Sequence, residues 1–340
     1  MRNLGTAVAV VLTVAASSAS AQSVFTLTVG LGGQYAHITD AVAVANSDSD
    51  LGNYYVVNLA PGTYINDFPT VLRPMTIQVD PAFAPQRAKL QATVPLPNQK
   101  GIILTFSSLT VRGLVFIGVQ ISNDLGGNGA GIRDQNPDNT PASLVVDNSA
   151  FHDNQEGILQ CCDAQETITI TNSRFRNNGT SDPDFFQHGI YINQAANLTV
   201  ANSLFCGQLI GHDIKSRAAQ TVVVGSQIYT GEGAPVWTGC RTGNASVNIE
   251  APNGGIVVVA GNTLVQGPSA QNHKIVSYGA EKKSYANNSL SVSKNSFVST
   301  TGSIGVYDPA CVPVVFDSNT FTGLGVVLNP ANCIAPSALR

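Results

Sequence analysis

A short motif recurs seven times between residues 148 and 321 of this chain. It begins with a small polar pair and ends with a large apolar residue, as in Asn148-Ser149-Ala150-Phe151 and Asn172-Ser173-Arg174-Phe175. The apolar positions of the seven copies are Phe151, Phe175, Phe205, Ile228, Leu264, Phe297 and Phe321. They are separated by 24, 30, 23, 36, 33 and 24 residues. A shortest period in the low twenties, with longer turns inserted, is typical of stacked coils that bury their apolar faces against one another.

The composition favours one all-β domain. Only 11% of the 340 residues are charged, against roughly 25% in an average globular protein. The abundance of Gly, Asn, Ser, Thr and Val suits short strands and tight turns. We therefore expect a single domain over residues 22–340, with the N-terminal cap and first coils in 22–80, and a monomer. A net charge of −4 argues against nucleic acid as a partner, but a local cationic groove for an acidic polymer is compatible with it.

Residues 1–21 are predicted to be a signal peptide. Arg2 provides a positive start, residues 8–16 are apolar, and Ala19-Ser20-Ala21 is a small-residue cleavage site. The apolar run is shorter than the ~20 residues that a membrane span requires. We therefore expect a protein without a membrane span that is secreted or periplasmic.

The cysteines fit an exported protein. The mature part holds an even number of them, which suggests disulfides. Cys311 and Cys333 lie about one coil apart and can bridge adjacent coils, and Cys206 with Cys240 is a second candidate pair. Metal binding is the alternative for the adjacent Cys161 and Cys162, but no C-x-x-C spacing supports it. Structural bridging is the expectation for all six.

The N-terminal region indicates a cap and then a fold family. Residues 38–45 are Ala-rich, with apolar side chains at helical spacing, and predict a short helix that covers the open end of the solenoid. The segment Gly32-Gly33-Gln34-Tyr35, this helix and then Ala60-Pro61-Gly62-Thr63-Tyr64 resemble the opening of the pectin lyase-like superfamily. Later segments such as 128–133 and 188–192 are similar to coils of that superfamily. The resemblance implies a right-handed parallel β-helix with a short N-terminal capping helix; the superfamily includes lyases, hydrolases, esterases, epimerases and binding proteins.

Aligned coils predict an outward-facing cluster of polar residues. We align Ile132, Ile158, Ile190, Ile214 and Ile249 as one inward column, because side chains alternate along a strand. The residues that follow them form an outward column of Arg133, Leu159, Tyr191, Lys215 and Glu250. Two positions further on, the column reads Gln135, Cys161, Asn193 and Arg217. The column one position before the isoleucines consists of Gly131, Gly157, Gly189, Asp213 and Asn248. Because glycine has no side chain, the three glycines would leave room for a bound chain at the base of the groove.

These residue types suit β-elimination from a uronate-containing polysaccharide. The reaction needs a base for the C5 proton, a cation for the carboxylate and an acid for the leaving oxygen. Lys215 is the candidate base and Tyr191 the candidate acid, while Arg217 and Arg133 would hold the carboxylate. Asn193 would bind the same chain. Glu250 and Asp213 would bind Ca²⁺ or orient Lys215, and Ca²⁺ is the one candidate cofactor. The alternative is that Asp213, Lys215 and Glu250 form a surface ion-pair ladder.

Histidines and loop residues leave other functions open. His188 and His212 share a column that faces inward or lies at the strand entrance, where a structural histidine competes with a catalytic one; no pair has the spacing of a transition-metal site. Long insertions at 177–187 and 229–246 would flank the groove, and Trp237 in the second is a sugar-stacking candidate. Further carboxylates in these insertions, Asp182, Asp184 and Glu232, keep a glycoside hydrolase open. A uronate epimerase and a non-catalytic carbohydrate-binding solenoid are the remaining alternatives.

Overall fold

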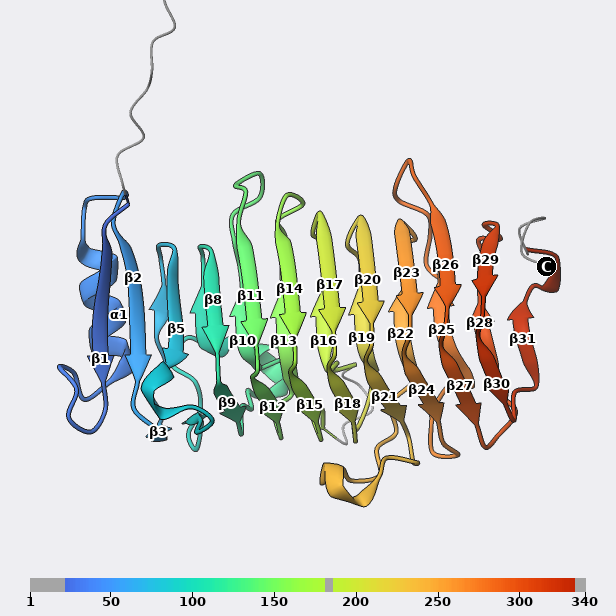
Figure 1. Cartoon of the computed structure of the whole chain (residues 1–340), viewed down its shortest axis with the longest axis horizontal. Coiled ribbons are helices and arrows are strands. Elements are labelled where there is room, and N and C mark those ends of the chain that lie inside the picture. The colour runs from blue at the N-terminus through green and yellow to red at the C-terminus, as the bar shows by residue number, and fades with distance from the viewer. Residues whose placement is uncertain (1–21, 181–185, 334–340) are drawn as a thin grey trace, which may run out of the picture.

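The chain is a right-handed parallel β-helix (Figure 1). The computed structural model describes residues 22–180 and 186–333. In the complete coils the backbone contributes one strand to each of three parallel sheets, which we call sheets A, B and C. The expected all-β solenoid is therefore confirmed.

Each sheet runs along the long axis of the molecule (Figure 1). Sheet A consists of β1 (Val24–Val29), β2 (Tyr54–Leu59), β5 (Met75–Val79), β8 (Leu109–Arg112), β11 (Ser143–Asp147), β14 (Thr167–Thr171), β17 (Asn197–Ala201), β20 (Gln220–Val224), β23 (Ile256–Ala260), β26 (Ser289–Ser293) and β29 (Val314–Asp317). Sheet B consists of β3 (Gly62–Ile65), β6 (Ala88–Gln91), β9 (Leu114–Ile117), β12 (Ala150–His152), β15 (Arg174–Arg176), β18 (Leu204–Cys206), β21 (Gln227–Thr230), β24 (Thr263–Gln266), β27 (Ser296–Ser299) and β30 (Thr320–Thr322). Sheet C consists of β4 (Thr70–Val71), β7 (Gly101–Thr105), β10 (Ala130–Asp134), β13 (Glu156–Gln160), β16 (Ile190–Ile192), β19 (His212–Ser216), β22 (Val247–Ala251), β25 (Lys274–Tyr278), β28 (Ile304–Tyr307) and β31 (Val326–Asn329).

The repeated polar pair forms the turn from sheet A to sheet B. Asn172 and Asn202 have φ angles of 51° and 50°, in the left-handed region that asparagine adopts more readily than most residues. The serine that follows points inward: Ser173 N donates to Ser203 Oγ at 3.2 Å, which satisfies a buried backbone group. The same ladder continues along the turn through the side chains of Ser226, Asn262, Asn295 and Asn319.

The apolar end of the motif builds the core behind sheet B. The register pairs the seven predicted anchors in one continuous column, as expected. Phe116, Phe151, Phe175 and Phe205 stack with ring centroids 4.7, 4.8 and 4.7 Å apart. The rings repeat at the spacing of the coils, so each phenyl group buries its faces against the next coil.

The predicted capping helix, α1 (Ile38–Ser47), is confirmed at the N-terminal end (Figure 1). Its buried residues are the four with helical spacing, Ile38, Ala41, Val42 and Ala45, and it contacts β1, β2 and β4. The Asp67 carboxylate accepts the backbone N–H groups of the first two helical residues, which have no partner within the helix.

The three disulfides match the expected structural bridging. They join Cys311 to Cys333 and Cys206 to Cys240, as predicted, and Cys161 to its neighbour Cys162. The Cys206–Cys240 bond ties β18 to the long loop between β21 and β22. This loop is central to the surface of sheet B described below.

Candidate functional site

The register predicted for sheet C is confirmed. The five isoleucines pair across neighbouring strands and are fully buried. The outward column also pairs as expected, in the order Arg133, Leu159, Tyr191, Lys215 and Glu250. Arg133, Tyr191, Lys215 and Glu250 therefore lie along one face of β10, β16, β19 and β22.

The column before the isoleucines faces the core, which corrects the expectation of an open floor. A Cβ atom on Gly131 would lie 2.7 Å from Cδ1 of Phe151, and one on Gly157 would lie 2.7 Å from Cδ1 of Phe175. Asp213 in the same column is buried and accepts a hydrogen bond from the Thr230 hydroxyl, so it binds neither substrate nor a metal on the outer face. The physical reason is an irregularity in the strand pairing. The residues of this column have no partner in the register. Each of them therefore faces the core together with the isoleucine that follows it.

Tyr191 is the centre of the outward cluster. Its phenol donates to Asn193 Oδ1 at 3.0 Å and accepts a hydrogen bond from Arg217 Nη1. Arg217 Cζ and Lys215 Nζ lie 5.4 and 5.6 Å from the centroid of its ring, within reach of a cation–π attraction. Burial raises the pKa of the Tyr191 phenol, although the charge of Arg217 opposes the shift. The phenol is therefore held in place by two hydrogen bonds, in which it donates to Asn193 and accepts from Arg217.

Lys215 lies between two carboxylates. Its Nζ is 3.3 Å from Glu281 Oε1 and 3.6 Å from Glu250 Oε2. Glu281 comes from the loop after β25 and also accepts from Arg217 Nη2 at 2.9 and 2.7 Å. Burial alone would raise the pKa of Glu281, but Arg217 and Lys215 outweigh it and lower that pKa. Because two carboxylates contact its Nζ as ion-pair partners, this environment does not suit the role of Lys215 as a base.

The two histidines support the cluster from the entrance of the strands. The backbone N–H of His212 donates to Nδ1 of His188 at 2.9 Å, and the His188 ring meets the edge of Tyr191 with centroids 5.1 Å apart. Burial lowers the pKa of His188 well below its usual range, and the positive charges around it act in the same direction. His212 Nε2 lies 2.7 Å from Glu250 Oε2. Nδ1 of the neutral His188 thus already accepts a hydrogen bond, and its ring packs against Tyr191.

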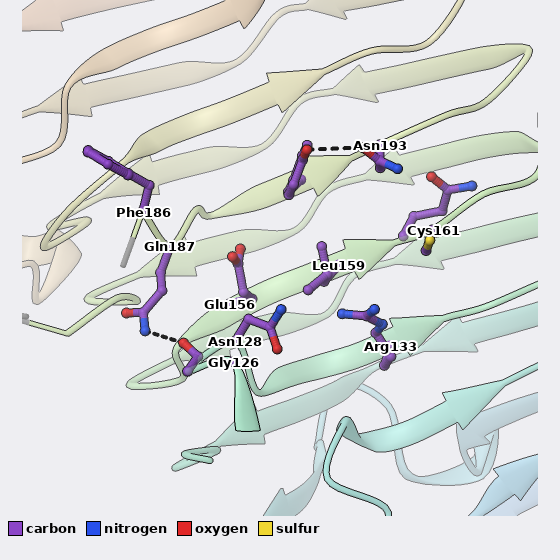
Figure 2. Close-up of a pocket in the computed structure, with 12 residues that line it drawn as sticks. Gly126, Asn128, Arg133, Glu156, Leu159, Cys161, Phe186, Gln187 and Asn193 are labelled. Carbon is purple, nitrogen blue, oxygen red and sulfur yellow. Dashed lines mark hydrogen bonds between the residues drawn. The ribbon is translucent and has the colours of Figure 1, made fainter. Parts of the chain in front are cut away.

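A pocket of about 270 Å³ lies beside Tyr191 on sheet C (Figure 2). Arg133, Glu156 and Leu159 from β10 and β13 line it together with Tyr191 and Asn193. Its other wall consists of residues 126–128, which follow the short helix η2 (Asn123–Leu125), and of residues 186–187. The Gln187 side chain closes this wall by donating to the carbonyl oxygen of Gly127.

Arg133 is a buried cation. The residue is only 9% exposed, and its Nε and Nη1 atoms have no hydrogen-bond partner among the described residues. Burial lowers the pKa of the guanidinium, although Glu156 and Asp134 partly offset this. A buried charged donor that lacks protein partners is costly, so an anionic ligand in the pocket would be strongly favoured.

Glu156 is the ionisable residue that the sequence argument missed as a participant in the site. Its Oε2 accepts the backbone N–H of His188 at 2.8 Å, and burial raises its pKa well above the usual range, against that hydrogen bond and the charges of Arg133 and Lys215. Glu156 lies in the column of His188 and His212, which the sequence predicts to face inward or to lie at the strand entrance.

A second cavity continues the site beyond Asn193. It has a volume of about 480 Å³ and is lined by Asn193, Arg217, Glu281 and Tyr285, among others. The Tyr285 hydroxyl donates to the carbonyl oxygen of Arg217, which ties the loop after β25 to sheet C. The two cavities share Asn193 and together follow sheet C across several coils.

Trp237 lies away from this site, contrary to the expectation that it would flank it. It belongs to the short helix η3 (Val236–Thr238) and lines a different cavity with residues of the turns into β15, β18 and β21. The reason is that the disulfide to Cys206 holds its loop against sheet B. Of the other predicted loop residues, Asp182 and Asp184 lie outside the described residues.

No metal centre is evident in the described part of the chain. No group of three or more His, Cys, Asp or Glu side chains in residues 22–180 and 186–333 is placed to hold a metal ion. In the same residues no helix has the length and apolar character needed to span a membrane.

Comparison with known proteins gives a weak structural likeness. No protein-family model matches the chain, and no curated protein matches it significantly. Two solved structures of the pectin methylesterase from Aspergillus niger, in deglycosylated and in penultimately deglycosylated form, are similar to it at 12% sequence identity. Each match covers 90% of this chain and 87% of the other, with TM-scores of 0.37 and 0.36. A likeness at this level carries no argument about activity.

Proposed function

We propose that this protein is a polysaccharide lyase that cleaves a uronate-containing chain by β-elimination in the groove on sheet C. The observation that carries the proposal is the buried guanidinium of Arg133 in a pocket that also holds Glu156 and Tyr191. Within the described part of the chain, its Nε and Nη1 atoms have no hydrogen-bond partner. A uronate carboxylate is the ligand that would satisfy Arg133 and place the sugar ring beside two groups able to transfer protons.

The proposed roles follow from the surroundings of each side chain. Arg133 binds the carboxylate and stabilises the negative charge that develops when the C5 proton leaves. Glu156, in its ionised form, takes that proton, because its raised pKa makes it a stronger base than an exposed glutamate. Tyr191 gives its proton to O4 as the C4–O4 bond breaks and a C4=C5 double bond forms. Arg217 donates to the phenol oxygen and would stabilise the resulting phenolate.

Lys215 and Arg217 also supply a second anion-binding position. In the free protein the Glu281 carboxylate lies between them. We propose that the carboxylate of a neighbouring uronate residue replaces it when the polymer fills both cavities. His188, His212 and Glu250 then act as positioning residues around Tyr191 and Lys215.

Hydrolysis, the main alternative, is less well supported. It commonly uses two carboxyl groups that flank the scissile bond. Among the described residues lining the Arg133 pocket, Glu156 is the only one with a carboxyl group. The other carboxylates of the cluster, Glu250 and Glu281, are paired with cations. Uronate epimerisation and binding without catalysis remain alternatives that the experiment below distinguishes.

We also propose that the protein is exported. Three disulfides fit an oxidising compartment. The signal-like residues 1–21, on which the prediction of a secreted or periplasmic location rests, lie outside the described residues.

A panel of uronate polymers tests the proposal. We expect wild type to generate the ultraviolet absorbance of a C4=C5 unsaturated uronate, and Arg133→Ala and Glu156→Gln to lose at least about a hundredfold in rate, as for removal of a transition-state interaction. Arg112→Ala, on the exposed side of sheet A, is the matched control and should retain full rate.

Three outcomes would contradict the lyase. Release of reducing ends without new absorbance would indicate hydrolysis, and altered C5 configuration without cleavage would indicate an epimerase. Binding of the polymer with no chemical change on the whole panel would indicate a binding module.

A further inference from the structure

We propose that Trp237 is the centre of a second saccharide-binding site, on the outer face of sheet B, that holds an acidic polysaccharide chain. It is distinct from the groove on sheet C and rests on the proposed lyase function only for the choice of polymer. The cavity beside Trp237 has a volume of about 380 Å³.

The loop that carries Trp237 is fixed to the outside of sheet B at several points. The Cys206–Cys240 disulfide joins it to β18, and Arg176 Nη1 donates to the carbonyl oxygen of Thr238 at 3.4 Å. Arg241 N donates to Asn177 Oδ1 at 2.9 Å. A small apolar cluster of Leu204, Cys206 and Tyr229, with Ala234, Cys240 and Val265 against it, packs beneath the loop and is separate from the main core.

Trp237 stays exposed although this apolar cluster lies beneath its loop. The residue is 67% exposed. A pinned loop with an apolar cluster of its own could bury a tryptophan, yet this one presents its ring to solvent beside a cavity. Rigid, exposed aromatic side chains lose little conformational entropy on binding and are characteristic anchors of recognition sites.

The opposite wall of the cavity is polar and carries a free positive charge. It contains the side chains Asn172, Arg174, Asn202 and Gln227. Arg174 is exposed, and no ion pair or hydrogen bond of the described residues involves its guanidinium. Its charge acts on Arg87, whose pKa is lowered by burial and then by Arg174.

This combination fits a uronate chain better than an apolar or neutral partner. The indole ring can pack against the C–H face of a sugar, while the amides of Asn and Gln can bond its hydroxyl groups. Arg174 adds a cation for a carboxylate. The wall residues come from three successive coils about 4.8 Å apart, so an extended chain can contact several of them.

Tryptophan fluorescence tests this site directly, because Trp237 is the only tryptophan in the chain. We expect titration with size-selected oligogalacturonate and oligoalginate, run in parallel, to shift or quench the emission with at least one of them. Arg174→Gln should weaken that binding at least about tenfold, the loss typical of one anchor residue, and a neutral glucan should give no shift. Arg133→Ala, in the other groove, should leave the titration unchanged even where activity is lost.

Calorimetry on the Glu156→Gln background completes the test. Trp237→Ala should remove one class of binding sites, while the exposed neighbour substitution Val236→Ala should leave both classes. The proposal is overturned if no acidic oligosaccharide changes the emission, if Arg133→Ala abolishes the change, or if Arg174→Gln leaves it intact. If the wild-type protein shows no lyase activity but its fluorescence titration is preserved, the proposed function alone is contradicted.

Discussion

Burial determines the chemistry of individual ionisable residues in this protein. Glu156 and Asp213 are both enclosed carboxyl groups with raised pKa values, but their neighbours differ. Glu156 lines a pocket with Arg133, whereas Asp213 faces the core and bonds a single hydroxyl group. Burial therefore supports a proposed catalytic role for Glu156, whereas at Asp213 it only makes the stability of the fold depend on pH.

Glu156 should set the acidic limb of the pH–rate profile. The proposed base must be ionised, and burial raises its pKa well above the usual range. We therefore expect kcat/KM to fall as the pH decreases through that raised pKa, and not only near the usual pKa of a glutamate. Kinetics across pH would measure this. A flat profile down to the ordinary glutamate range would exclude Glu156 as the base.

Asp213 should make stability depend on pH. Burial raises its pKa from 3.8 to about 8, although the Thr230 hydroxyl opposes the shift. The folded state thus keeps a proton that the unfolded state has lost, so the contribution of Asp213 is complete below about pH 4 and is lost as the pH rises to about 8.

Asp213→Asn should remove that dependence. Within this range the free energy of unfolding of wild type should fall by roughly 1.4 kcal/mol per pH unit relative to the variant. Urea unfolding of both proteins at pH 5 and pH 8 measures the difference. Parallel pH dependences of wild type and variant would show that Asp213 ionises normally in the fold.

At the scale of the strands, three small residues let sheet C lie close to the phenylalanine stack. Gly131, Gly157 and Gly189 occupy the column where the strand turns inward, directly against the rings on sheet B. The outward positions next to them then carry Glu156 and His188. The inward turn at the glycines and the outward placement of the functional residues are therefore one structural feature.

Gly157→Ala should be strongly destabilising. Its Cβ would lie 2.3 Å from the carbonyl oxygen of Gly189 and 2.7 Å from the Phe175 ring, so the backbone must move. We expect a loss of roughly 1–3 kcal/mol in the free energy of unfolding, the usual cost of overpacking. Gly62→Ala in β3 is the matched control, because a Cβ there meets nothing within 4 Å. Equal effects of both substitutions in chemical denaturation would contradict this account.

At the scale of the whole molecule, the ends of the solenoid require protection. A stack of coils presents unpaired strand edges and apolar side chains at each end. Helix α1 covers the first coils, and Asp67, from the loop between β3 and β4, holds the start of that helix. One carboxylate thus couples the cap to the coils beneath it.

Asp67→Ala should loosen the cap and promote association. Loss of its hydrogen bonds should cost about 0.5–2 kcal/mol, as for other helix N-terminal caps. The exposed end would then pair with other molecules, so light scattering should detect oligomers in the variant while wild type is monomeric. Asp40→Ala, on the exposed side of the same helix, is the control. A monodisperse Asp67→Ala protein would show that the cap holds without this residue.

The sequence by itself determined the features that repeat. The motif predicted the register of sheet B, the isoleucines that of sheet C, and the apolar spacing predicted α1. These were predictable because one backbone hydrogen-bond pattern and one core position recur in each coil, so the register of a few coils fixes the rest.

Only the tertiary structure decided the features that do not repeat. In sheet C, the irregular strand pairing turns Asp213 toward the core and places Glu156 in a pocket. This arrangement depends on close packing against the phenylalanine rings of sheet B. The loops that brought Glu281 to Arg217, and kept Trp237 on sheet B, are held by a few long-range contacts. Such contacts join residues far apart in the chain and produce no periodic pattern in the sequence. The shape of the candidate site is therefore determined only by the tertiary structure.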